Sequence, residues 1–190
     1  MKERIRLFLR QSLDTVRLSP VETFLTLFFF VYCALIVEKK ITDHEEFMAL
    51  FPLFFSAAFL LNRWLPRAPG RWAYYLTPVV LVPFFWVGDL KDWILSVSYA
   101  IALVICPLMI FVCRWKRDNR AFVGDALHYL KNLLLAGLLS GVAFLLVLAI
   151  YFSLHYIFPS LPLGREEKVV SYVAMFFFIL LLPLIFLTFN

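Results

Sequence analysis

Three ionisable side chains, Asp125, His128 and Lys131, lie close together in the sequence and could do acid–base or anion-binding chemistry. Residues three or four positions apart share one face of a helix, so the three would form a single polar cluster. Histidine changes its charge near neutral pH, and such a cluster could relay protons or bind a phosphate group. Because the neighbouring residues are apolar, we interpret the cluster as a salt-bridging group at a membrane interface.

A second candidate is Glu22, which lies in an apolar run where ionisable residues are functional suspects by default. It also stands three residues after Ser19, with Pro20 between them. This pattern predicts a capping box, in which the serine and glutamate side chains satisfy the first amide groups of a helix. We therefore expect a structural role for Glu22, with a proton or cation site as the alternative.

Composition indicates which medium surrounds these residues. Hydrophobic residues make up 63% of the 190 residues and charged residues 16%, whereas an ordinary soluble domain is roughly 45–50% apolar. A chain of this size cannot bury that excess in its own core, so the surplus must face lipid. The net charge of +5 is not accompanied by a nucleic-acid-binding motif, so we expect no nucleic-acid partner.

The apolar runs predict an all-α protein, a polytopic transmembrane helical bundle with about six spans. Residues 1–18 place apolar side chains at helical spacing opposite basic ones, which predicts an amphipathic interfacial helix that binds anionic lipid headgroups. Residues 19–190 form the transmembrane domain. Its expected spans are residues 20–37, 47–61, 73–87, 93–113, 127–158 and 169–189.

Basic residues predict how these spans are oriented. Twelve lysine and arginine residues fall on one side of the expected bundle and five on the other. The first set lies in residues 1–19, 62–72 and 114–126, and the second in residues 38–46, 88–92 and 159–168. Because basic loops stay in the cytoplasm, this positive-inside bias predicts a multi-pass protein of the cell inner (cytoplasmic) membrane with both termini cytoplasmic.

Two further patterns concern how the spans pack. Small residues on the fifth span form a face that permits close approach of another helix, at Ala136, Gly137, Ser140 and Gly141. We favour packing within the chain, with homo-oligomerisation through this span as the alternative. Prolines occur inside four other spans, at Pro52, Pro78, Pro83, Pro107 and Pro183. We interpret them as ordinary residues of membrane helices, although in transporters such breaks expose backbone to a substrate.

The sequence contains no metal-binding, nucleotide-binding or hydrolase motif, so we expect no cofactor, no metal and no enzyme activity. The leading hypothesis is a non-enzymatic membrane domain that anchors, senses or assembles. One alternative is a small transporter or channel-like protein with a midplane polar cavity. A weaker alternative is an intramembrane lipid-headgroup enzyme built on Asp125, His128 and Lys131. The transporter requires polar side chains to converge between helices, namely Tyr32, Ser56, Thr77, Ser98 and Tyr99.

The chain opens with the run Phe8-Leu9-Arg10-Gln11-Ser12-Leu13, which leads into Ser19-Pro20-Val21-Glu22-Thr23. Together with the aromatic-rich spans, this stretch resembles a bacterial family of polytopic membrane proteins of unknown function, and the resemblance in hydropathy extends over most of the chain. Members of that family tend to be longer than this chain, so the resemblance implies an amino-terminal membrane region of a longer protein. The last apolar run also stops at Asn190 without a basic flank.

Overall fold

The computed structural model describes residues 15–39, 45–64, 71–86, 90–112, 119–158 and 166–190. Within these residues every regular element is helical, which confirms the predicted all-α class. The expected amphipathic helix over residues 1–18 lies mostly outside the described residues. Only its last turn, residues 15–18, is described, and that turn is helical.

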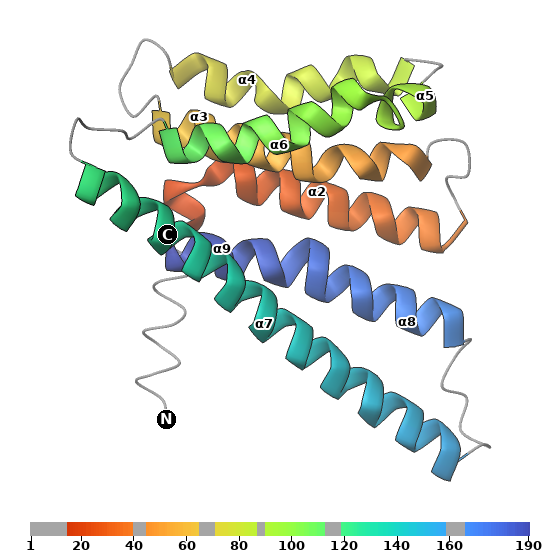
Figure 1. The fold of residues 1–190 in the computed structure, drawn as a ribbon. Helices are drawn as coiled ribbons and strands as arrows, with labels where there is room; N and C mark the ends of the chain where they lie inside the picture. The colour runs from red at the N-terminus through yellow and green to blue at the C-terminus, as the bar shows by residue number, and fades with distance from the viewer. Residues whose placement is uncertain (1–14, 40–44, 65–70, 87–89, 113–118, 159–165) are drawn as a thin grey trace.

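The helices follow the expected spans closely along the chain (Figure 1). The elements in order are α2 (Pro20–Val37), η1 (Glu45–Ala49), α3 (Leu50–Trp64), α4 (Arg71–Leu81), η2 (Val82–Trp86), α5 (Leu90–Ile94), α6 (Val97–Val112), α7 (Asn119–Ile157), α8 (Glu166–Met175), η3 (Phe176–Leu181) and α9 (Leu182–Phe189). α2 has the predicted bounds. α7 begins at Asn119, whereas the expected span begins at residue 127, so this helix extends well before the apolar run.

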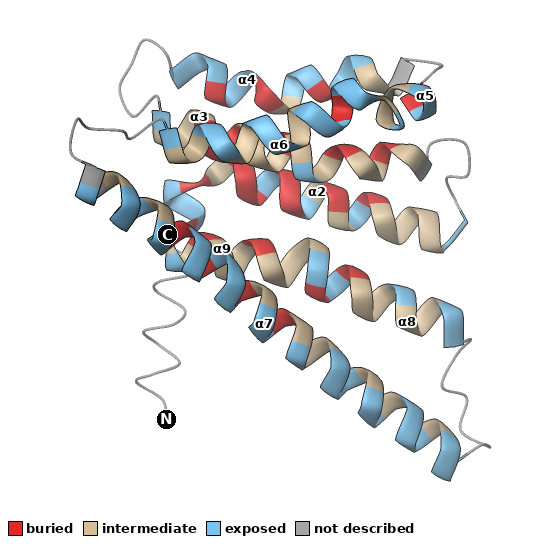
Figure 2. Ribbon diagram, in the orientation of Figure 1, coloured by how far each residue is buried: buried red, intermediate tan, exposed pale blue. Residues whose placement is uncertain are grey.

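Four helical stretches among the described residues are long and apolar enough to cross a membrane. They are Pro20–Val37, Glu46–Trp64, Phe122–Ile157 and Glu166–Phe189, and α6 is a shorter apolar helix. Their outward faces carry large apolar side chains, and Leu138, Leu145 and Ile150 of α7 are each at least 60% exposed. Figure 2 shows pale blue, exposed segments along much of α7. These exposed apolar faces indicate a transmembrane helical protein.

The main core surrounds α2, which contacts α3 and α4 on one side and α8 and η3 on the other (Figure 1). Leu25, Phe29, Phe47 and Leu50 are fully buried in this core. The rings of Phe29 and Phe47 stack with their centroids 5.5 Å apart. This aromatic packing joins α2 to η1 and α3, and buried segments of α2 and α3 are red in Figure 2.

Two irregularities in the helices have local causes. Ser96 separates α5 from α6 because its Oγ accepts the Tyr99 N–H at 3.3 Å, which caps the first turn of α6. In the last span, Pro183 has no N–H to donate to the carbonyl four residues earlier. The preceding segment η3 adopts π-helical bonding, in which the Leu182 N–H donates to Phe177 O.

Candidate functional site

Glu22 is fully buried between α2, α3 and α4. Its two carboxylate oxygens accept hydrogen bonds from different helices. Tyr74 Oη of α4 donates to Oε2 at 2.5 Å, and Asn62 Nδ2 of α3 donates to Oε1 at 2.8 Å. Tyr74 Oη also accepts the Val21 N–H at 3.0 Å. We call Glu22, Asn62 and Tyr74 the Glu22 cluster, and its bonds join three helices at one point.

The predicted capping box at Ser19 and Glu22 is wrong. Ser19 makes no side-chain capping bond, and its own N–H donates to Thr15 O at 2.9 Å. The turn formed by residues 15–18 therefore supplies the bond that the glutamate side chain was expected to supply. Because that amide is already satisfied, the Glu22 side chain is free to reach α3 and α4 instead. Pro20 does occupy the start of α2, as predicted.

The Glu22 cluster leaves little room for a solute. Each carboxylate oxygen already has a donor, and Glu22 and Tyr74 are both 0% exposed. Among the described residues, no group of three or more histidine, cysteine, aspartate or glutamate side chains could hold a metal ion. A buried carboxylate with two donors fixes the positions of the helices that supply them. The chemistry that this arrangement supports best is therefore helix-to-helix attachment.

A second polar cluster lies at the same end of α3, where Arg63 directly follows Asn62 of the Glu22 cluster. Arg63 donates to Asn190 O at 2.6 Å. Asn132 of α7 is 5% exposed and donates to Phe189 O at 2.8 Å and to Asn190 Oδ1 at 3.2 Å. We call Arg63, Asn132 and Asn190 the Asn132 cluster. It ties α3 and α7 to the end of α9 (Figure 1).

The three predicted polar residues of α7 lie at the surface of the helix. Asp125, His128 and Lys131 are all exposed. His128 Nε2 lies 3.0 Å from Asn132 Nδ2, so it borders the Asn132 cluster. Asn132 is buried and faces the bundle, and sequence reasoning missed it. Its position four residues after His128, as an amide inside an apolar run, was the available signal.

The small-residue face of α7 is divided between two environments. Ala136 and Ser140 are fully buried, whereas Gly137 and Gly141 are only partly buried. A Cβ atom added at either glycine would have no heavy atom within 4 Å. Helix contact within the chain therefore involves Ala136 and Ser140, and the glycine edge of the face is open.

Polar side chains that a transport cavity would need have other roles in the structure. Tyr32 is packed in the aromatic core, and Tyr99 Oη donates to Ala49 O. Thr77 Oγ1 donates to Ala73 O within its own helix at 3.3 Å. Ser98 is exposed.

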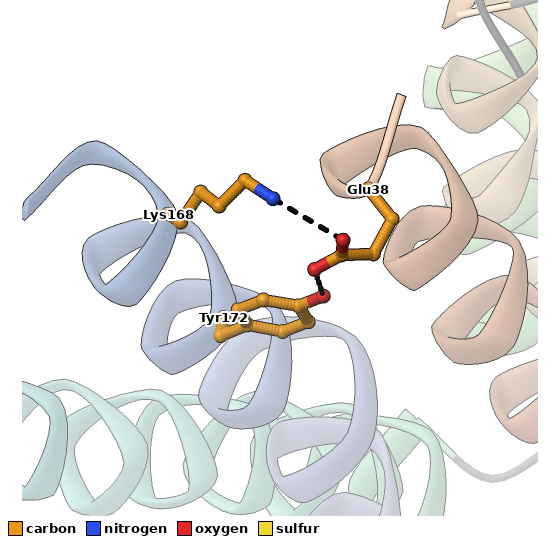
Figure 3. Close-up of polar contacts among 3 residues, drawn as sticks. All are labelled: Glu38, Lys168 and Tyr172. Carbon is orange, nitrogen blue, oxygen red and sulfur yellow. Dashed lines mark hydrogen bonds and ion pairs between the residues drawn. The ribbon is translucent and has the colours of Figure 1, made fainter. Parts of the chain in front are cut away.

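A polar contact at the opposite end of α2 joins it to α8 (Figure 3). Glu38, directly after α2, accepts a hydrogen bond from Tyr172 Oη at 2.6 Å and pairs with Lys168 Nζ at 3.2 Å. Both partners lie one turn apart on α8, so the carboxylate connects two consecutive turns. His155 of α7 also lies 2.9 Å from a Glu166 oxygen at this end. These contacts are exposed, and they attach the ends of neighbouring helices.

No protein-family model matches the chain, and no curated protein or solved structure is significantly similar to it.

Proposed function

We propose that this chain is a non-enzymatic membrane domain that anchors or assembles other components. The observation that carries this proposal is the bonding of polar groups inside the bundle. Glu22 and Asn132 are buried and bonded to neighbouring helices, and Thr26 Oγ1 donates to Glu22 O at 2.8 Å. Buried polar groups that are bonded in this way stabilise one helix arrangement.

The proposed topology has six crossings. Four are the helices long enough to span a membrane, and the other two are α4 with η2, and α6. Both shorter elements pack against α3, which favours placing them beside a crossing helix. The positive-inside bias supports a bacterial inner membrane with both termini in the cytoplasm. We also propose that the chain belongs to the bacterial membrane protein family that it resembles. That membership would make it the amino-terminal membrane region of a longer protein.

The proposed partners are membrane lipids, with anionic headgroups at the basic segment of residues 1–18. Self-association through α7 is a second candidate interaction because the edge at Gly137 and Gly141 has room for a neighbouring helix.

Cysteine labelling can separate this proposal from a transporter. In a chain whose native cysteines are replaced, single cysteines are introduced at the buried positions Thr26 and Thr77 and at the exposed position Lys39, which lies between two spans. Vesicles of both orientations are then treated with a membrane-impermeant maleimide. We expect Lys39→Cys to react from one side, and Thr26→Cys and Thr77→Cys to resist from both sides. Reaction of either buried cysteine at a rate near that of Lys39→Cys would show a hydrated path and overturn the proposal.

Topology is tested in the same vesicles. Cysteines at residues 65 and 118 are expected to react only from the cytoplasmic side, and reaction from outside would reverse the proposed orientation.

A further inference from the structure

A cleft of about 230 Å³ lies between α3, α6, α7 and the last span. Its walls are aromatic and aliphatic, and they include Phe55, Ile110, Leu133 and Phe186. The polar side chain among its lining residues is Ser56, whose hydroxyl group donates to Pro52 O at 2.6 Å. With that hydroxyl engaged, the wall offers hydrocarbon contacts and has no donor for a polar solute.

Prolines of three different spans meet at this cleft, Pro52 of α3, Pro107 of α6 and Pro183 of α9. Pro107 lies inside α6, where it removes a backbone donor. Pro52 lies in the first turn of α3, and Pro183 follows the π-helical segment η3. Irregular helices cannot pack as closely as regular ones along their whole length. The prolines therefore account for a space that the surrounding side chains do not fill.

The cleft opens at the surface of two apolar helices. Leu133 and Phe178 line it and are 50% and 43% exposed, and both belong to helices long enough to span a membrane. Pockets for drug-sized ligands usually occupy roughly 300–1,000 Å³. The cleft is smaller than that range, and its size and apolar wall suit part of a single hydrocarbon chain.

The apolar surface continues toward basic side chains. A second pocket of about 70 Å³ shares Phe59 and Leu133 with the cleft and extends to Tyr129. The Arg63 guanidinium carbon lies 5.2 Å from the centroid of the Phe59 ring. The His128 ring lies 6.4 Å from the Tyr129 ring. A groove that is apolar along its length and basic at one end is complementary to an amphiphile with a negative headgroup.

We propose that this cleft binds one acyl chain of an anionic phospholipid, whose phosphate lies beside Arg63 and His128. The lipid fills the space between the α3–α6 pair and the α7–α9 pair. It acts as a structural ligand, because the protein's own side chains leave a gap between these two pairs of helices.

Native mass spectrometry tests the proposal on the whole chain. The protein is purified with equal amounts of phosphatidylglycerol and phosphatidylcholine that carry the same acyl chains, and the retained lipids are counted. We expect one tightly retained phosphatidylglycerol per chain in addition to any bound at residues 1–18, with about tenfold more phosphatidylglycerol than phosphatidylcholine retained. Leu133→Trp places a large ring in the cleft and is expected to reduce that retention about tenfold. Leu134→Trp is the matched control, because Leu134 is 58% exposed and does not line the cleft.

Arg63→Gln tests the headgroup contact separately and is expected to reduce the preference for phosphatidylglycerol over phosphatidylcholine. Equal retention of the two lipids by the unaltered chain would overturn the proposal, and this measurement does not depend on any variant folding. Unchanged retention in Leu133→Trp, or an equal loss in Leu134→Trp, would also overturn it. An Arg63→Gln chain that keeps the full preference would refute the position assigned to the phosphate.

Discussion

Replacing Tyr74 with phenylalanine removes one hydroxyl group and keeps the buried ring. That hydroxyl group donates to Glu22 Oε2 at 2.5 Å and accepts the Val21 N–H at 3.0 Å. A hydrogen bond to a charged group contributes about 1.5–3 kcal/mol and a neutral one about 0.5–1.5 kcal/mol. Side-chain hydrogen bonds measured in membrane proteins lie toward the lower end of such ranges. We therefore expect Tyr74→Phe to lower the free energy of unfolding by about 1–2 kcal/mol.

The assay is unfolding in mixed micelles as the fraction of sodium dodecyl sulfate rises, followed by tryptophan fluorescence. Tyr75→Phe is the matched control on the same helix, because the Tyr75 side chain is 47% exposed. Its change is expected to stay within about 0.5 kcal/mol. A double-mutant cycle between Tyr74→Phe and Glu22→Gln should give a coupling energy of at least about 1 kcal/mol, since the two side chains are in direct contact.

Two results would refute this reasoning. If Tyr74→Phe unfolds at the same detergent fraction as Tyr75→Phe, the hydroxyl group contributes nothing measurable to the attachment of α4. If both Tyr74→Phe and Glu22→Gln destabilise but their effects simply add, the hydrogen bond between them is not the source of the loss.

Three further predictions can be checked with the same unfolding assay. Gly137→Ala should leave stability unchanged or raise it by up to about 1 kcal/mol, since the added Cβ meets open space. Ser140→Leu, at a fully buried position, should instead lower stability by about 1–3 kcal/mol. A loss of stability in Gly137→Ala, together with less cross-linked dimer, would place a second copy of the chain on that edge of α7. Lys39 has φ 55°, so Lys39→Gly should raise stability by up to about 1 kcal/mol, and a decrease would mean that the lysine side chain contributes more than its backbone costs. Glu38→Gln should cost no more than about 1 kcal/mol because its pair with Lys168 is exposed, and a loss that persists at high salt would contradict this.

The positions of the helices could be predicted from the sequence because apolar runs of sufficient length determine them. α2 ends at Val37 as expected, and Pro20 marks its start. Helix ends are less predictable when polar residues continue a helix beyond the apolar run, as they do from Asn119 in α7. The π-helical bonding before Pro183 was also not predicted. A proline removes one backbone donor from the helix, but it does not determine which hydrogen-bond pattern replaces the lost bond.

The partners of the polar residues could not be predicted, because they depend on which helices become neighbours. Glu22 fits a local capping pattern, yet its donors Asn62 and Tyr74 lie 40 and 52 residues away in the sequence. In the same way, Asn132 bonds with a carbonyl 57 residues away. Local spacing drew attention to Glu22 and to the start of α7, while the tertiary contacts decide which partners those residues have.

Helix length sets how the proposed crossings meet the bilayer. α7 has 39 residues, about 58 Å of helix, whereas α6 has 16 residues, about 24 Å. The hydrocarbon layer is about 30 Å thick. In the proposed six-crossing topology, lipids beside α6 would therefore have to thin, whereas α7 would tilt or extend its polar first turns, residues 119–126, beyond the hydrocarbon layer. Thinning on the α6 side alone would draw the protein to places where bilayer thickness changes, such as the border of a lipid domain.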